Sequence, residues 1–250
     1  MNFVVFGLIL ICCHAWAIEI DDNFAAIWFE GPKINLENFF EKLKSSVQNG
    51  TSGLNIYGIP IRDPMFIETA IRLPTGVLSA FVGDTNLEGF LKNFNLSGLA
   101  SYNVNSAKFK PIDLTAHIDI SWPCINASTN YSLKGNVLNY DIYGDGGING
   151  TLHNFRTIMD VGFNLKDRYM QVQTIATKIF LDALKFNATG LYNDEDISKI
   201  FSKTISDVTS KLITTNQKTI SHIINNFATR IFNKFLLTIT FPDLLKAIGL

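Results

Sequence analysis

The hydrophobic pattern of this chain changes its period, and this change constrains the fold more than any other feature. From about residue 67 to 186, apolar and polar residues alternate, as in Leu114–Trp122 and Met159–Phe163. Such alternation is typical of strands with one buried and one solvated face, which favours antiparallel pairing. Because no helical stripe interrupts the strands, the pattern predicts a meander rather than βαβ units.

From Asp194 onward the period returns to 3.6 residues and predicts helix. Asn193 is the expected N-cap, Thr214–Asn216 predicts a kink or break, and Pro242 should end the pattern. About 40 helical residues would span ~60 Å, so one apolar side of that length needs a long sheet beside it. The predicted fold class is therefore α+β, with a long curved antiparallel sheet wrapped around a long C-terminal helix.

Shorter signals locate further elements. An apolar stripe predicts a helix over residues 32–50, with Asn35 as its cap and Gly50 just after its end. Turn-forming residues predict strand connections at 93–98, 103–106, 144–150 and 166–167. The glycine-rich stretch 144–150 fails the G-x-G-x-x-G pattern and no helix follows it. It is interpreted as a flexible connection or a bulge that needs positive φ.

The first 17 residues have the pattern of a secretory signal peptide. The apolar run from Phe3 to Cys13 is shorter than the ~20 residues of a membrane-spanning helix, and Ala15–Ala17 is a small-x-small cleavage pattern. A buried N-terminal helix is the alternative. We expect a signal peptide at 1–17, a single domain at 18–250, a secreted extracellular protein, and no stable membrane insertion.

Six N-x-S/T sequons follow the expected cleavage point and are candidate glycosylation sites. They begin at Asn49, Asn95, Asn126, Asn130, Asn149 and Asn187. Cys124 is the only cysteine after residue 17, so the remaining chain cannot form an internal disulfide. A buried, unreactive thiol is the favoured interpretation of Cys124, and pairing between two chains is the alternative.

Charge and motif content exclude several classes of function. The chain has 21 Lys+Arg against 22 Asp+Glu, which supplies no basic field for a nucleic acid. His117, His153 and His222 lack metal-ligand spacing, and there is no G-x-S-x-G elbow. We therefore expect no catalytic residue, no metal, no cofactor and no nucleic-acid partner. An esterase site assembled only in three dimensions is the remaining enzymatic alternative.

Four segments carry a family resemblance through their order and spacing. They are Ile59–Met65 (IPIRDPM), Tyr131–Gly146 (YSLKGNVLNYDIYGDG), Leu184–Asn187 (LKFN), and Ile231–Lys234 with Phe241–Leu245 (IFNK, FPDLL). Together they resemble the arthropod juvenile-hormone-binding/takeout family of the TULIP lipid-binding superfamily, over roughly residues 32–248. Asp63–Met65 also resembles the mite group 7 allergens. The family's usual N-terminal cysteine pair is missing, which leaves the identity of the ligand open.

The resemblance implies a curved sheet around a long helix that encloses an apolar tunnel for a small hydrophobic ligand, such as a terpenoid or fatty acid. The expected lining is Ile118, Ile120, Trp122, Leu138, Tyr140, Val161, Phe163, Phe201, Ile205 and Phe227, with Tyr140 as a polar anchor. A solid core at these positions is the alternative.

The expected function is a secreted carrier or scavenger of such a ligand. The alternative is a membrane- or microbe-surface lipid-binding protein of the bactericidal/permeability-increasing type. A monomer is compatible with the sequence.

Overall fold

The computed structural model describes residues 18–20, 36–56, 59–72, 85–137 and 140–247. The expected signal peptide, Asn35 and Leu138 lie outside these residues. A small antiparallel sheet joins β1 (Ile18–Ile20), β2 (Leu54–Ile56) and β3 (Ile59–Pro60). Helix α3 (Leu36–Asn49) lies beside it, and Gly50 follows with a φ of 68°, as the sequence predicts.

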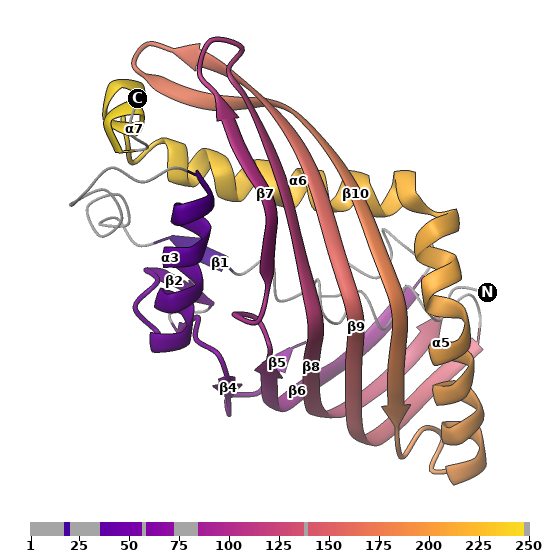
Figure 1. The fold of residues 1–250 in the computed structure, drawn as a ribbon. Coiled ribbons are helices and arrows are strands. Elements are labelled where there is room, and N and C mark those ends of the chain that lie inside the picture. The colour runs from indigo at the N-terminus through magenta and orange to yellow at the C-terminus, as the bar shows by residue number, and fades with distance from the viewer. Residues whose placement is uncertain (1–17, 21–35, 57–58, 73–84, 138–139, 248–250) are drawn as a thin grey trace.

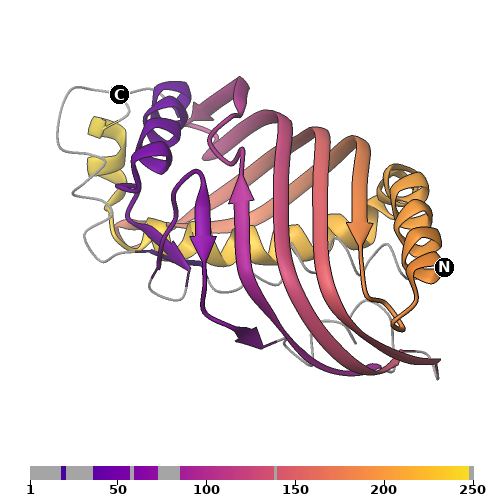
Figure 2. The same cartoon turned by 90° about the horizontal axis from the view of Figure 1, so that it is seen from below.

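A second, seven-stranded sheet dominates the molecule, and its strand order is β10-β9-β8-β6-β4, with β5 paired to β6 and β7 to β8. Its strands are β4 (Met65–Ile67), β5 (Ile71–Arg72), β6 (Thr85–Ser97), β7 (Asn103–Lys110), β8 (Thr115–Val137), β9 (Tyr140–Lys166) and β10 (Tyr169–Ala188). All pairings between the described strands of this sheet are antiparallel. The strands curve along the C-terminal helices (Figures 1 and 2), which confirms the predicted fold class.

Three helices complete the fold: α5 (Glu195–Thr215), α6 (Gln217–Leu236) and α7 (Phe241–Ala247). The break between α5 and α6 falls at Asn216, within the segment predicted to interrupt the helix. The predicted N-cap is wrong by one residue. Asp194 is the cap, because its side chain accepts hydrogen bonds from the backbone N–H groups of Asp196 and Ile197. The prediction that Pro242 ends the helical pattern is wrong, because α6 ends at Leu236 and Pro242 lies in the first turn of α7, where no intrahelical donor is lost.

In the three longest strands the alternation of buried and exposed residues shifts by one position, and the three shifts lie side by side across the sheet. On β8 the buried apolar positions are 116, 118 and 120 and then 125; on β10 the alternating buried positions are 177, 179 and 181 and then 184. Each strand therefore has two successive residues outside the buried alternation: Pro123–Cys124 on β8, His153–Asn154 on β9 and Asp182–Ala183 on β10, and Nε2 of the His153 ring is itself buried. Cys124 lies opposite His153, which in turn lies opposite Ala183. This shared irregularity keeps one apolar face on the inside as the sheet bends.

Two of the predicted turns are wrong, because 103–106 and 144–150 lie within β7 and β9. The predicted turn at 93–98 is largely strand as well, since β6 continues to Ser97 and Asn93 marks an irregularity with a φ of 53°. The turn at 166–167 is confirmed.

None of the glycines of 144–150 has a positive φ, and Gly144 and Gly146 permit close approach of another segment. A Cβ on Gly146 would lie 2.1 Å from the carbonyl oxygen of Thr189, where the chain leaving β10 crosses β9.

The outer edge of β10 is bonded to the helices through a polar stripe. The stripe consists of Ser198, Ser202, Ser206, Gln217, Ser221, Asn225 and Asn233. Ser202 Oγ accepts the Ala188 N–H at 2.8 Å, Ser206 Oγ accepts the Phe186 N–H at 2.9 Å, and Ser221 Oγ donates to the Thr177 carbonyl at 2.7 Å. Side-chain groups thus take the place of a further strand.

We expect Ser202→Ala to lower the free energy of unfolding by ~1–3 kcal/mol, because it leaves the buried Ala188 N–H without an acceptor. Urea unfolding followed by circular dichroism measures the change. The control is Ser45→Ala, since the Ser45 hydroxyl is exposed and bonds only to a carbonyl of its own helix; it should change stability by less than about 0.5 kcal/mol. Equal effects of the two substitutions would contradict the role given to the stripe.

Candidate hydrophobic-ligand site

A cavity of about 190 Å³ lies between α3, α6, α7 and the ends of β7–β10. Every described side chain that lines this α3–α6 cavity is apolar. The lining residues are Leu36, Phe39, Phe40, Leu43, Leu54, Phe109, Ala116, Ile118, Val161, Phe163, Met170, Ile231, Phe232, Phe235, Leu236 and Leu244. Such a surface binds a ligand by removing apolar area from water.

The periodicity of the helix and strand sequences places these side chains on the faces that border the cavity. Leu36, Phe39, Phe40 and Leu43 share one face of α3 because they are three and four residues apart. On the sheet, alternation brings Ala116 and Ile118 of β8 beside Val161 of β9, with Ala116 directly opposite Val161. The cavity therefore lies where two helical stripes face one strand surface.

Tyr102 fastens α3 to the sheet. Its hydroxyl donates to the Phe40 carbonyl at 2.5 Å, and the Lys44 ammonium lies 5.1 Å from the centre of its ring. Burial raises the pKa of Tyr102 well above its ordinary value, so the phenol stays a neutral donor at physiological pH. This contact holds the α3 wall of the cavity against β7.

A second, smaller apolar cavity lies under α5. Its volume is about 100 Å³, and it is lined by Tyr131, Leu133, Ile142, Ile148, Phe186, Ala188, Leu191, Tyr192, Ile197 and Phe201. The Tyr131 hydroxyl donates to the Thr189 carbonyl at 2.8 Å, and burial raises the pKa of Tyr131 to about 12. This α5 cavity shares no described lining residue with the α3–α6 cavity.

A packed core occupies the level between the two cavities. Ile125, Leu152, Ile179 and Ile205 are buried there, and the ring of Trp122 packs against that of Phe155 with centroids 5.6 Å apart. Along β8 the order is Ile118 at the first cavity, Ile125 in the core, and Leu133 at the second cavity. The described residues thus form two cavities with solid packing between them.

The residues predicted to line a tunnel are distributed over these regions. Ile118, Val161 and Phe163 line the α3–α6 cavity, and Phe201 lines the α5 cavity. Ile120, Trp122 and Ile205 pack in the core. Phe227 is half-buried on α6, with the Arg230 guanidinium 5.7 Å from the centre of its ring. The side chain of Tyr140, like Leu138, lies outside the described residues.

The sequence prediction omitted the α3 wall of the cavity. The apolar stripe of residues 36–43 is evident in the sequence, but only the folded chain shows that it faces α6 and the strands. Leu244 of α7 was omitted for the same reason.

Comparison with known proteins identifies the family. Residues 7–246 match the family described as haemolymph juvenile hormone binding protein (JHBP). The chain belongs to this family. Among solved structures, it is similar to Takeout 1 of Epiphyas postvittana, at 16% identity and a TM-score of 0.53, covering 84% of this chain and 97% of that one. It also matches a lipopolysaccharide binding protein at 12% identity and a TM-score of 0.29, over 80% of this chain and 40% of that one. No curated protein matches the sequence.

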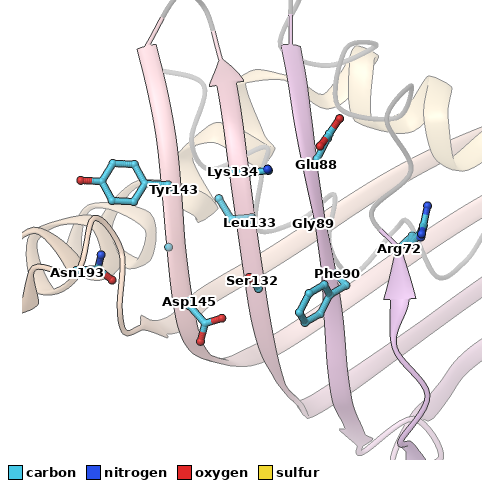
Figure 3. A pocket seen from close by; sticks show the side chains of 11 residues that line it. Arg72, Glu88, Gly89, Phe90, Ser132, Leu133, Lys134, Tyr143, Asp145 and Asn193 are labelled. Carbon is cyan, nitrogen blue, oxygen red and sulfur yellow. The ribbon is translucent and has the colours of Figure 1, made fainter.

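This JHBP-family chain also has a polar groove on the large sheet. The groove has a volume of about 700 Å³ and lies across β5, β6, β8 and β9 (Figure 3). It is lined by Arg72, Glu88, Gly89, Phe90, Ser132, Leu133, Lys134, Tyr143, Gly144, Asp145 and Asn193. Lys134 lies opposite both Glu88 and Tyr143, so cations, carboxylates and rings are interleaved. This mixed lining differs from the two apolar cavities.

The remaining polar clusters among the described residues connect β8 and β9 of the large sheet. Asp119 accepts hydrogen bonds from Arg156 Nε at 2.8 Å and Nη2 at 2.5 Å, and these bonds lower the pKa of Asp119 below its ordinary value. His117 Nδ1 lies 2.7 Å from Asp160 Oδ1. Among the described residues, no group of three His, Cys, Asp or Glu side chains has the arrangement of a metal site.

All six sequon asparagines are exposed. Asn49 ends α3, and the other five lie on β6, β8, β9 and β10, where Asn149 pairs directly with Asn187. Cys124 is half-buried rather than buried, and its Sγ lies 3.7 Å from Asn126 Oδ1.

We expect Phe163→Ala to cost less stability than Phe155→Ala. Phe155 packs against the solid core, where loss of a phenyl ring costs ~3–5 kcal/mol, whereas Phe163 borders existing empty space and makes fewer contacts to lose. Urea midpoints of the two variants provide the measurement, with an expected difference of at least about 1 kcal/mol. A larger loss for Phe163→Ala would mean that its surroundings are packed as solid core.

Proposed function

We propose that this protein is a carrier of a small hydrophobic ligand held in the α3–α6 cavity. The observation that carries the proposal is the wholly apolar lining, which α3, α6, α7 and five strands supply together. Membership of a family described as juvenile hormone binding supports the same chemistry. The ligand class we propose is a terpenoid, a fatty acid or a similar lipid.

The lining favours recognition by shape and apolar area rather than by a headgroup. A ligand that buries about 300 Å² of apolar surface gains ~7 kcal/mol before the costs of binding are subtracted. The cavity of about 190 Å³ is below the ~300–1,000 Å³ of sites for drug-sized ligands, so it favours a slender chain. The predicted anchor Tyr140 stays a hypothesis.

Filling the cavity tests the proposal. Ala116 is buried in the lining, and Ala116→Leu places a larger side chain in the empty space. We expect binding of cis-parinaric acid, a slender fluorescent fatty acid, to weaken at least about tenfold, while the fold keeps or gains ~0.5–2 kcal/mol of stability. Fluorescence titration and urea unfolding measure the two effects.

The matched control is Ala176→Leu, the same change at an exposed position of β10. It should leave the affinity for the probe unchanged. If Ala116→Leu and Ala176→Leu both bind as the parent chain does, the ligand site lies elsewhere.

Farnesol and the corresponding hydrocarbon farnesene should compete for the probe with affinities within about tenfold, because no described lining residue can bond the hydroxyl. Displacement titrations measure both. Much tighter binding of farnesol than of farnesene would indicate a polar anchor. If Tyr140→Phe then abolished the preference for farnesol, Tyr140 would be that anchor.

We also propose that residues 1–17 are removed and that the exposed sequons are glycosylated, as expected of a secreted carrier. Expression in insect cells should give a secreted chain that begins at Ile18 and loses mass on treatment with peptide N-glycosidase. N-terminal sequencing and mass spectrometry measure both features. Retention of Met1 without a mass change would contradict the proposal.

A further inference from the structure

We propose that the two adjacent hairpin tips at the end of the α3–α6 cavity dock on an anionic lipid surface, from which the ligand enters. The hairpin tips are residues 110–114, between β7 and β8, and residues 165–169, between β9 and β10. The inference rests on the proposed function only in treating the ligand as lipid-like.

The two tips expose apolar side chains side by side. Ile112 is 95% exposed, and Leu165 and Tyr169 are 46% and 38% exposed. The Phe163 N–H donates to the Leu114 carbonyl at 2.8 Å, which joins the two hairpins at their ends. Figure 1 shows both hairpins projecting at the same end of the molecule, beside α7. Exposed large apolar side chains gathered at one end are typical of an interaction surface.

The tips carry three cations and two carboxylates, and this net charge of +1 favours an anionic surface over an uncharged one. Lys110, Lys166 and Arg168 are exposed, and within the described part of the chain none of them forms an ion pair. The carboxylates within the tips are Asp113 and Asp167. Apolar side chains flanked by cations suit the interface between acyl chains and anionic headgroups, where each cation contributes ~1 kcal/mol.

The tips continue directly into the apolar cavity. Phe109 and Phe163 line the cavity, with ring centroids 6.1 Å apart, and they lie three residues before Ile112 and two before Leu165. The Arg168 carbonyl accepts the Phe241 N–H at 2.8 Å, which places the start of α7 against the second tip, and Leu244 of α7 is another lining residue. A ligand leaving a bilayer at the tips would meet Phe109 and Phe163 at the adjoining end of the cavity.

The sequons on the strands lie away from this end. The five strand asparagines lie in the half of the sheet away from the tips; on β8 they are Asn126 and Asn130, beyond the line at Pro123–Cys124. Any sugar attached there would not stand between the tips and a membrane.

Vesicle flotation of the full secreted chain tests docking. We expect the protein to float with vesicles of phosphatidylcholine containing about one third phosphatidylserine, and less with phosphatidylcholine alone. Ile112→Asp should reduce the bound fraction at least fivefold. Combined replacement of Lys110, Lys166 and Arg168 by Gln should weaken binding about fivefold for each cation removed, the equivalent of ~1 kcal/mol each.

Matched controls separate the tips from the general surface. Ile200→Asp changes an isoleucine of α5 that is 68% exposed, and replacement of Lys178, Lys185 and Lys218 by Gln removes the same charge at exposed positions elsewhere. Both controls should float as the parent chain does. Equal losses in tip and control variants, or no flotation of the parent chain, would overturn the proposal.

A second readout separates this proposal from the carrier function. Ile112→Asp should slow uptake of cis-parinaric acid from anionic vesicles but leave its equilibrium affinity in solution unchanged. Loss of affinity in solution would count against the tip as a docking element, because the substitution would then act on the site itself. If sedimentation shows a dimer that Ile112→Asp dissociates, the tips join two copies and docking on lipid is wrong.

Discussion

The hydrogen bonds between the polar stripe and the outer edge of β10 determine how the two layers of this protein meet. A free strand edge exposes backbone donors and acceptors that would otherwise pair with another chain. Here Ser202, Ser206 and Ser221 satisfy them from the helices, together with the longer side chains of Gln217 and Asn225. Because these bonds are directional, they fix how far each helix is rotated about its axis, and therefore which residues face the concave side of the sheet.

That rotation explains where the packing is solid and where it is not. Where the side chains of the helices and strands interdigitate, around Ile179, Ile205 and Ile213, the core is fully buried. At the C-terminal end of α6, the sheet, α3 and α7 surround the α3–α6 cavity. Their aromatic side chains line this cavity without filling it. An empty apolar volume in a protein loses dispersion contacts along its whole wall, at ~24 cal/mol per Å³ of cavity. A ligand in the α3–α6 cavity would restore those contacts, so the same fold can be stabilised by what it carries.

Much of this architecture was predictable from the sequence because it follows from local periodicity. Alternation in Ala116, Ile118 and Ile120 gives the buried face of β8, and the helix break at Asn216 follows from weak helix propensity. Predictions failed where long-range packing overrides local preference. The segment 144–150 lies within β9, and Gly146 is required there because the Thr189 carbonyl passes too close for a side chain. Ser202 was indistinguishable from a solvated helix position, because only the position of β10 makes its hydroxyl an acceptor.

The candidate site shows the same limit. Three of the predicted lining residues on the strands, Ile118, Val161 and Phe163, border the α3–α6 cavity, since alternation identifies the inward face correctly. Alternation cannot separate positions that border a cavity from those that pack solidly, and Ile120 and Ile118 have the same local pattern on one strand. Ile118 borders the cavity and also packs with Ile120 and Tyr102, and the Tyr102 hydroxyl bond to the Phe40 carbonyl holds α3 against the sheet, so the cavity wall depends on α3 and not on β8 alone. The net charge of −1 is likewise an average, since the hairpin tips carry Lys110, Lys166 and Arg168 against two carboxylates, a local charge of +1.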